Sequence, residues 1–432
     1  MSRGIRGRSA AWALAFVVGV LVAGSVHAAG FGLFEQGSKA MGMAGAFTAQ
    51  ADDPSAMFHN AAGLAFQRES RIMGGITYIT SESGEFRGAA PYPGPNATGE
   101  LEPLSEFLPH AYYVRPIGQT ATFAIGTYAP FGLTTEWKNK TTFSGRYLSV
   151  LASLRVVGLY PTFAWQATPR FGIGIGAIAR VSDVKLERYI PQVNPFTRRV
   201  VDVANVKLDS DFDYGYGFNF GILHKWSDAF SWGLSYRSSI KVEYSGDAQF
   251  TQISTGNAQF DALIARALPF GSPIPVETAI KFPDIASFGM AYRFSPSFIV
   301  EADVNWTGWS SFSTLPLTFP NNPTLSSTVE ENWNDAYNYR IGCNWATSAT
   351  SEWRFGFVYD ETPQPKEAMG PLLPDANRTG YTFGYGHKGG KFNTDIAFMY
   401  LPFENRSTAV NHDNFNGSYK NTAYLLGATL SF

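Results

Sequence analysis

The sequence contains very little cysteine and little charge. Cys343 is the one cysteine among 432 residues, so no internal disulfide forms, and there is no cysteine–histidine cluster of the zinc-binding kind. Charged residues make up 16% of the chain, and the formal net charge is −2. Such a chain lacks the basic surface that nucleic acid binding requires. We therefore expect no nucleic acid partner, no metal and no other cofactor.

Long apolar runs are absent after the first 28 residues. Residues 1–28 have the layout of a secretory signal peptide, in which Arg3, Arg6 and Arg8 precede an apolar stretch at 10–23. Val26-His27-Ala28 is a small-x-small cleavage site. The alternative is a membrane-anchoring helix, but the stretch is shorter than the roughly 20 residues that a helical span needs. No later run is long enough, so a membrane role would rest on strands.

Instead, the chain alternates apolar and polar side chains. In residues 211–222 the even positions are aromatic or aliphatic, and the odd positions are aspartate, asparagine or glycine. Residues 333–345 repeat this alternation, with Asp335 and Ala336 as exceptions. Side chains of a strand point alternately to opposite faces, so each stretch is a strand with one apolar face. Because the opposite faces carry glycine and charge, we expect the aromatic faces to point outward, toward lipid.

The alternation predicts about fourteen strands, joined alternately by short turns such as Thr168-Pro169-Arg170 and by long loops such as 247–275. This layout is typical of an outer-membrane barrel. We therefore predict an all-β protein, a transmembrane antiparallel β-barrel in the bacterial outer membrane. Tryptophans beside the short turns fit a membrane interface: Trp165, Trp226, Trp232, Trp345 and Trp353. The predicted strands lie near 71–80, 107–116, 120–129, 150–167, 170–187, 206–226, 230–246, 276–294, 297–312, 331–347, 351–361, 379–388, 391–403 and 420–432.

The last predicted strand ends the chain at Phe432, which shares an apolar face with Tyr424, Leu426 and Leu430. A terminal phenylalanine on such a strand looks like the assembly signal of outer-membrane barrels. We therefore expect the barrel-assembly machinery among the partners, together with outer-membrane lipid and lipopolysaccharide.

Residues 30–64 do not alternate and are rich in glycine and alanine. A barrel of about fourteen strands has a lumen too wide for its own side chains to fill. We predict that this stretch plugs the lumen, which divides the chain into a signal peptide (1–28), an N-terminal plug (29–66) and a barrel (67–432). The alternative is a disordered periplasmic tail. Modest charge and apolar residues such as Phe31 and Phe34 argue against disorder.

Several motifs, in order along the chain, resemble the FadL/TodX family of outer-membrane transporters for long-chain fatty acids and aromatic hydrocarbons. They are the mature start AGFGLFEQGSKAMGMAGAFTAQADDPSAMFHNAAGLA (29–65), YAPFGL (128–133), TEW (135–137), LYPTFAW (159–165), WNDAYNYRIG (333–342), YDETPQP (359–365) and LPDANR (373–378). The resemblance implies passive uptake of a hydrophobic small molecule, which outer loops capture and an inner pocket holds. It also implies an N-terminal hatch and a sideways exit through a kinked strand.

The family's hatch motif is Asn-Pro-Ala, and here it reads Asn60-Ala61-Ala62. Proline fixes a backbone angle, so without it the bend of the hatch must be held in another way, with Asn60 as its expected hinge. For the strand kink, Gly126 and Pro130 are the candidates, since strand glycine marks bulges and proline cannot donate to a ladder. The alternative is that both merely end a strand.

Apolar clusters in predicted outer loops are the candidates for substrate capture. They comprise Phe131, Leu133, Trp137, Phe143, Tyr147, Leu263 and Leu268. An alternative role for these clusters is anchoring at the membrane interface. Arg146 and Lys281 are candidate contacts for a substrate carboxylate.

Two other functions compete with hydrophobic uptake. A hydrolase is disfavoured because G-x-S-x-G and H-E-x-x-H are absent, and His59 near Asp52 and Asp53 is the closest to a catalytic grouping. We predict that the protein is not an enzyme and has no catalytic residues. A water-filled porin for small polar solutes remains the alternative, and it requires an unplugged lumen.

Overall fold

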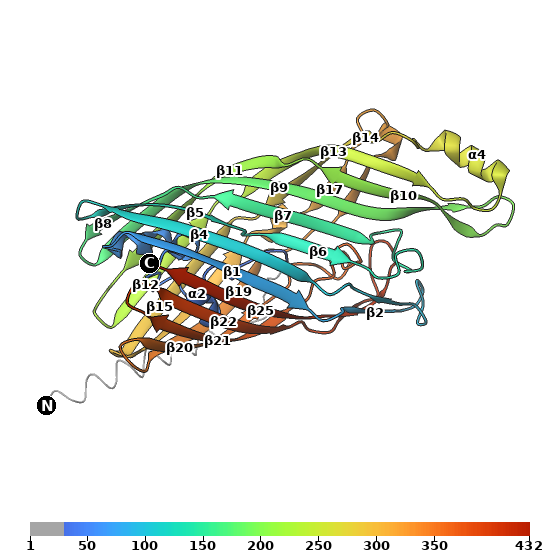
Figure 1. Cartoon of the computed structure of the whole chain (residues 1–432). Coiled ribbons are helices and arrows are strands. Elements are labelled where there is room, and N and C mark those ends of the chain that lie inside the picture. The colour runs from blue at the N-terminus through green and yellow to red at the C-terminus, as the bar shows by residue number, and fades with distance from the viewer. Residues whose placement is uncertain (1–29) are drawn as a thin grey trace.

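Fourteen membrane-crossing strands form one closed antiparallel sheet, and five of them are interrupted. This computed structural model describes residues 30–432, so the predicted signal peptide lies outside the described residues. The sheet closes where β1 (Arg71–Ser81) pairs with β25 (Thr422–Ser431), while the other edge of β1 pairs with β4 (Ser105–Ile117). The fourteen-stranded barrel predicted from the alternation is thereby confirmed (Figure 1).

The remaining barrel strands follow in chain order, and each interrupted strand carries two labels. They are β5 (Ala121–Tyr128) with β6 (Gly132–Glu136), β7 (Leu151–Leu159) with β8 (Thr162–Thr168), β9 (Phe171–Val193), β10 (Val200–Ser210) with β11 (Asp213–His224), β12 (Phe230–Arg237) with β13 (Ile240–Gln252), β14 (Ile274–Phe282) with β15 (Ile285–Ser295), β16 (Phe298–Thr307), β19 (Ala336–Ala346), β20 (Ser351–Asp360), β21 (Arg378–Lys388) and β22 (Asn393–Pro402).

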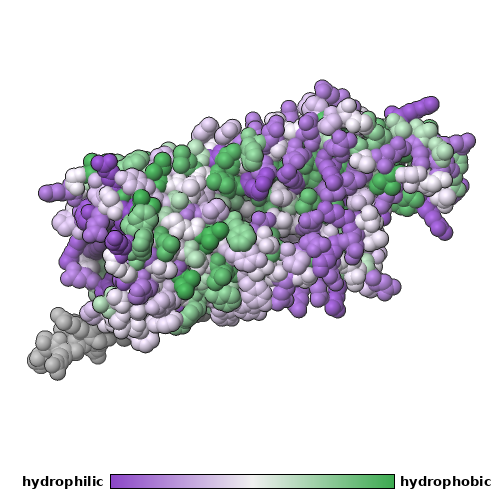
Figure 2. Space-filling view, viewed as in Figure 1, coloured by the Kyte–Doolittle hydropathy of each residue, from purple (hydrophilic) through white to green (hydrophobic). Residues whose placement is uncertain are grey.

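The outer surface of the barrel is divided into an apolar part and a polar part. Figure 2 shows apolar residues in a band across the half with the short turns, and mostly polar residues over the half with the long loops. Outward aromatic side chains account for much of the apolar part, and Tyr216 is 74% exposed. Contact of such aromatic side chains with water is unfavourable, whereas their contact with lipid is favourable. Among the described residues, no helix is both long and apolar enough to span a membrane.

Residues 30–66, the N-terminal segment, are almost entirely buried and contact strands on opposite sides of the barrel. The segment contains α2 (Ser38–Gly42), α3 (Ala56–His59) and the 3-10 helix η1 (Ala61–Phe66). Inward glycines let the wall approach it closely, since a Cβ at Gly174 would collide with Ala61 and a Cβ at Gly342 with Met43. The glycines that alternate with aromatic residues along the strands therefore make room for this segment.

At the long-loop end, a small sheet covers the barrel mouth. It consists of β2 (Glu85–Gly88), β3 (Thr98–Glu100), β23 (Arg406–Thr408) and β24 (Gly417–Lys420). We call this sheet the cap. Its aromatic core joins distant parts of the chain: Phe86, Trp137, Phe143, Phe415 and Tyr419. The hairpin of β17 (Thr314–Leu317) and β18 (Ser327–Glu330) lies beside β14, and α4 (Ala258–Ala267), η2 (Trp309–Ser311) and η3 (Pro323–Leu325) complete the loops.

Candidate functional site

The centre of the candidate site is an aromatic cage around Phe31, which is 4% exposed. The ring of Trp309 lies 4.6 Å from that of Phe31, and the ring of Phe312 lies at 5.5 Å. Phe131, Phe282 and Trp333 complete the cage at 5.8 to 6.2 Å. These centroid separations are those at which aromatic pairs attract. The N-terminal segment thus places one aromatic side chain in an apolar site whose walls come from four separate parts of the chain.

Arg180 on β9 is a buried cation beside this cage. It is 1% exposed, and its guanidinium lies 5.0 Å from the ring of Phe131 and 5.8 Å from that of Phe282. Within residues 30–432 none of its three guanidinium nitrogens makes a well-formed hydrogen bond or an ion pair, and the polar group that interacts with it is the buried hydroxyl of Tyr160. A buried charge without a counter-charge is costly. Such a cation is suited to bind an anion, and a carboxylate matches the fork of its donors.

The strand interruption at Pro130 lies directly beside the cage. β5 ends at Tyr128 and β6 begins at Gly132, and the ladder between β4 and β5 stops at the pair Ala111 and Thr127. Past that pair, no ladder joins β4 to β6 in the described residues. The wall therefore has a gap in pairing around Pro130, whereas Gly126 lies within the intact ladder opposite Tyr112. That this gap is an exit stays a prediction.

The N-terminal segment supplies the missing partners of this interruption. Leu33 donates its backbone N–H to the carbonyl of Pro130 at 2.9 Å, and Gly132 donates to the carbonyl of Phe31 at 3.0 Å. The side chain of Gln36 donates to the carbonyl of Ala129 at 2.6 Å. Buried backbone groups require such partners. Any movement of Phe31 out of its cage is consequently coupled to the backbone of the kink.

Two cavities meet at Phe31. The larger holds about 170 Å³, and its lining includes Phe34, Leu133 and Arg340. The smaller holds about 40 Å³ and is almost wholly apolar, with Leu154, Phe312 and Glu331 in its lining. Since Phe31 lines both cavities, displacement of its ring would join them.

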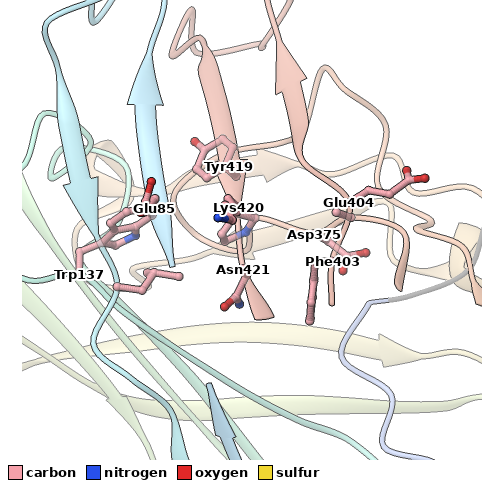
Figure 3. A pocket seen from close by; sticks show the side chains of 11 residues that line it. Glu85, Trp137, Asp375, Phe403, Glu404, Tyr419, Lys420 and Asn421 are labelled. Carbon is pink, nitrogen blue, oxygen red and sulfur yellow. The ribbon is translucent and has the colours of Figure 1, made fainter. Parts of the chain in front are cut away.

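A third pocket, of about 10 Å³, lies where the cap meets the barrel. Figure 3 shows Trp137 and Glu85 on one side of it and Asp375 and Phe403 on the other, with Asn421 between them. Its volume suits about one water molecule. The cap therefore closes the mouth tightly here, and the candidate ligand space lies beneath it.

The bend of the N-terminal segment is held by the side chain of Asn60. Its Oδ1 accepts from the backbone N–H of Ala62 at 3.1 Å, and its Nδ2 donates to the carbonyls of Thr48 at 2.8 Å and Ile222 at 2.9 Å. One amide thus caps η1, fixes the segment to itself and fixes it to β11. These bonds hold the bend where proline is absent at Ala61.

Replacing Asn60 by alanine is expected to lower the free energy of unfolding by about 2–4 kcal/mol, because two buried carbonyls lose their donor. The measurement is urea unfolding of the refolded protein in lipid vesicles. Asn60→Asp is the companion variant: it keeps the acceptor for Ala62 but sets an oxygen against the two carbonyls, so it should destabilise the protein at least as much as Asn60→Ala. A loss below about 0.5 kcal/mol in Asn60→Ala, the usual scale of surface substitutions, would contradict this assignment.

The residues predicted to capture substrate lie in separate parts of the structure. Phe131 and Leu133 belong to the apolar cluster of the cage, whereas Trp137, Phe143 and Tyr147 belong to the cap cluster. The last two candidates belong to α4 and its end, where Leu268 packs on β10 and Leu263 is 54% exposed. The structure thus divides these residues among three clusters, and their role in substrate capture stays a prediction. Trp137 and Phe143 are buried because Phe86 of β2 covers them together with Phe415 and Tyr419, which lie more than 270 residues further along the chain.

Neither predicted carboxylate contact faces the cage. Arg146 donates to both carboxylate oxygens of Asp202 at 3.0 to 3.1 Å, so an internal partner already neutralises it. Lys281 is exposed on the outer face of β14, directly opposite Lys241. We correct this prediction and replace both residues by Arg180. A sequence signal existed, because Arg180 is a lone arginine among small inward residues of its strand, but pairing is not visible in sequence.

The grouping considered for a hydrolase is not assembled. His59 is packed edge-on between the rings of Phe47 and Phe58, and burial lowers the pKa of its imidazole to about 3. Asp52 pairs with Lys39 instead, and Asp53 accepts from Ser55. Among the described residues there is also no group of three or more histidine, cysteine, aspartate or glutamate side chains able to hold a metal.

Glu331, in the loop after β18, is a buried acid of the smaller cavity. It is 3% exposed and accepts from Nε1 of Trp333 at 2.8 Å, and burial raises its pKa from 4.5 to about 7. In this pH window the folded protein keeps a proton that the unfolded chain releases. The free energy of unfolding therefore falls as the pH rises from about 4.5 to about 7.

Glu331→Gln is expected to remove this part of the pH dependence, because an amide does not ionise. The measurement compares urea unfolding midpoints at pH 5 and pH 8. The neighbouring exposed carboxyl in Glu330→Gln is the control, and its midpoints should follow those of the unsubstituted protein. An unchanged slope in Glu331→Gln would assign the pH dependence to other groups.

Comparison with known proteins agrees with this architecture. The chain matches the family described as Outer membrane protein transport protein (OMPP1/FadL/TodX) over residues 19–432. It is 23% identical over 408 residues to a long-chain fatty acid transport protein of Escherichia coli O6:H1, covering 89% of this chain and 88% of that protein. A FadL homologue of Pseudomonas aeruginosa is similar in structure, with a TM-score of 0.80 at 19% identity and coverage of 94% and 99% of the two chains. The toluene transporter TodX of P. putida has a TM-score of 0.67 at 16% identity and coverage of 94% and 98%.

A closed barrel with outward aromatic side chains, an occupied lumen and an enclosed apolar site is the architecture of an outer-membrane transport protein. The chain belongs to the OMPP1/FadL/TodX family of such proteins. Its structural neighbours, at these identities, establish the fold alone.

Proposed function

We propose that this protein carries long-chain fatty acids passively across the outer membrane. The observation that carries the proposal is Arg180, a buried cation without an ion-pair partner in residues 30–432, set among aromatic rings. A neutral hydrocarbon cannot form an ion pair with such a charge, whereas a fatty acid has both a carboxylate and an apolar chain. The matched long-chain fatty acid transport protein supports the same substrate class.

In this proposal Phe31 occupies the site that an alkyl chain takes during transport. Its cage offers the dispersion contacts that an alkyl chain needs, and it separates the two cavities. A bound chain displaces the ring, and its carboxylate pairs with Arg180. The N-terminal segment is therefore a hatch whose first residues respond to ligand.

The proposed exit lies at the kink beside Pro130. Phe31 and Leu33 hold the kink backbone through two hydrogen bonds, so withdrawal of the hatch end leaves the gap between β4 and β6 uncovered. A sideways exit suits an apolar solute, because the lumen below the cage is lined with charge. Arg340 and Asp303 are examples, and both bond to the hatch backbone.

The same bonds argue against a water-filled porin. Asp303 accepts from the backbone of Phe47 and Thr48 at 2.9 and 3.0 Å, and Glu301 accepts from Ala49 at 2.5 Å. These buried contacts bind the hatch to the wall, so an axial water path requires that they break.

Uptake measurements test the proposal. A Gram-negative host strain that lacks its own long-chain fatty-acid transporter would express the full chain, and the initial uptake of radiolabelled oleate and toluene would be measured. Saturable oleate uptake above that of the empty strain is expected. Oleate uptake equal to that of the empty strain, in cells with folded protein in the outer membrane, would overturn the proposal.

A further inference from the structure

The barrel wall has a second interruption, between β11 and β13. Below it, the ladder runs from Asn219 opposite Arg237 to His224 opposite Trp232, and above it from Ser210 opposite Gly246 to Ala204 opposite Gln252. The two ladders keep the same register. Between them, therefore, neither segment has an extra residue relative to the other. In the described structure only two backbone bonds lie inside this interval, Asp211 to Ser245 and Ser238 to Phe218, at its two ends.

The pairing fails because the two segments alternate out of phase. The flanking register sets Tyr214 opposite Val242 and Tyr216 opposite Ile240. Yet Tyr214 and Tyr216 are 66% and 74% exposed on the outer face, whereas Val242 and Ile240 are 1% and 2% exposed and point inward. Partners in a ladder must point to the same face, and a one-residue slip would correct the phase. The ladders above and below fix the register and prevent that slip. The opening therefore follows from the alternation of inward and outward side chains in the sequence.

Side chains rather than a ladder close this opening. β13 passes behind β11, so that a Cβ at Gly217 would lie 2.8 Å from Cγ1 of Ile240 and a Cβ at Gly215 would lie 2.8 Å from Cγ2 of Val242. Deeper in the lumen, the hydroxyl groups of Tyr244 and Ser182 are 2.7 Å apart. Two apolar side chains resting on two glycines are a closure that opens without breaking any backbone hydrogen bond.

The inner side of the opening leads to the candidate site. Ile240, Val242 and Tyr244 belong to the apolar cluster that contains Phe131 and Phe282, the two rings beside Arg180. The outer side presents Tyr214 and Tyr216, with exposed Lys241 just beyond them. Tyrosine and lysine in this order mark the boundary between lipid tails and head groups. β13 and β14 bend together there, at residues 238–239 and 283–284, and continue beyond the apolar part of the wall (Figures 1 and 2).

We propose that the opening between β11 and β13 is a second lateral portal, through which the alkyl chain of a fatty acid or a similar apolar compound passes between the cage and the outer leaflet. The portal rests on the proposed function, and it adds a route that does not pass the kink. Ile240 and Val242 are its gate, and rotation of these two side chains away from Gly217 and Gly215 opens it while the ladder between β10 and β13 stays paired.

Reversible cross-links test the portal in the full chain expressed in the same transporter-deficient cells. All variants carry Cys343→Ser to remove the native thiol. Gly217→Cys with Ile240→Cys locks the gate, because the two Cβ atoms lie within disulfide reach. Leu33→Cys with Pro130→Cys locks the hatch end to the kink. Met290→Cys with Ala302→Cys, opposite each other in the intact ladder of β15 and β16, is the control lock.

Oxidation of the gate lock is expected to lower the initial rate of oleate uptake by about twofold if the two exits share the flux evenly, and reductant should restore it. Both locks together should stop uptake, whereas the control lock should not change it. Ile240→Ala with Val242→Ala, which removes the gate without a cross-link, should raise uptake. If oxidation of the gate lock leaves the uptake rate unchanged, the portal is refuted and the proposed function stands. The kink lock does not decide this point, because it also holds Phe31 in its cage. If no oleate is taken up without any lock, the proposed function itself fails.

Discussion

Replacing Arg180 by methionine is expected to weaken oleate uptake by about 10- to 100-fold at low substrate concentration and to leave toluene uptake unchanged. Charge-assisted hydrogen bonds contribute about 1.5–3 kcal/mol each, and the fatty acid loses them while the apolar contacts of the cage remain. Methionine keeps the length of the side chain without its charge. The split between the two substrates is therefore the measurement that assigns the role of this residue.

The same substitution carries an independent readout. Because Arg180 is buried with no ion-pair partner in residues 30–432, removal of its charge is expected to stabilise the ligand-free protein against urea. Arg180→Lys keeps a charge but not the forked donor geometry. Its oleate uptake should therefore lie between that of the unsubstituted protein and that of Arg180→Met. Equal loss of oleate and toluene uptake in Arg180→Met would show that the arginine shapes the pocket rather than binds the carboxylate.

Removing the hatch should have the other large effect. Deletion of residues 30–62 from the mature chain is expected to raise single-channel conductance in planar bilayers by about tenfold or more, because a fourteen-stranded lumen is too wide for its own side chains to seal. The intact protein should conduct little, since Glu301 and Asp303 hold the segment by its backbone. The expected currents are steady rather than brief openings.

Point variants separate loss of the hatch from loss of the fold. Glu301→Gln with Asp303→Asn leaves every residue of the hatch present and weakens its attachment, so brief openings are expected on an otherwise closed baseline. The shift in gel mobility between heated and unheated samples reports whether each variant is a folded barrel. A folded deletion variant with the low conductance of the intact protein would show that other elements, such as the cap, seal the lumen.

Much of the fold could be predicted from the sequence because period-2 alternation is a local property. Each of the fourteen strands repeats this alternation over about ten residues. The alternation is required along each strand, because one face contacts lipid and the other faces the polar interior. The N-terminal segment was predicted for the opposite reason, since it lacks the pattern and the lumen requires filling. The interruption between β5 and β6 contains Pro130, whose backbone chemistry does not depend on distant residues, whereas Gly126 is paired normally with Tyr112.

The site depended on pairings that a sequence does not display. Arg146 and Arg180 are both arginines near aromatic residues. Only the structure shows that Arg146 pairs with Asp202 and that Arg180 has no acidic partner in residues 30–432. Trp137 was predicted as exposed, and residues from β24 bury it. Phe31 meets Trp309 and Trp333 across almost 300 residues. Such contacts follow from the closure of the barrel rather than from local propensity.

The seam between β1 and β25 has a consequence for biogenesis. The hatch bonds to both strands of this seam: Thr77 of β1 donates to the carbonyl of Glu35 at 3.1 Å, and the hydroxyl groups of Ser38 and Thr429 lie 2.8 Å apart. If the barrel closed first, this 37-residue segment would have to enter through the short-turn end, where it joins β1, and then reach both strands of the seam. We expect instead that the segment docks while the sheet still has two free edges, so that its docking and the final pairing of β1 with β25 occur together.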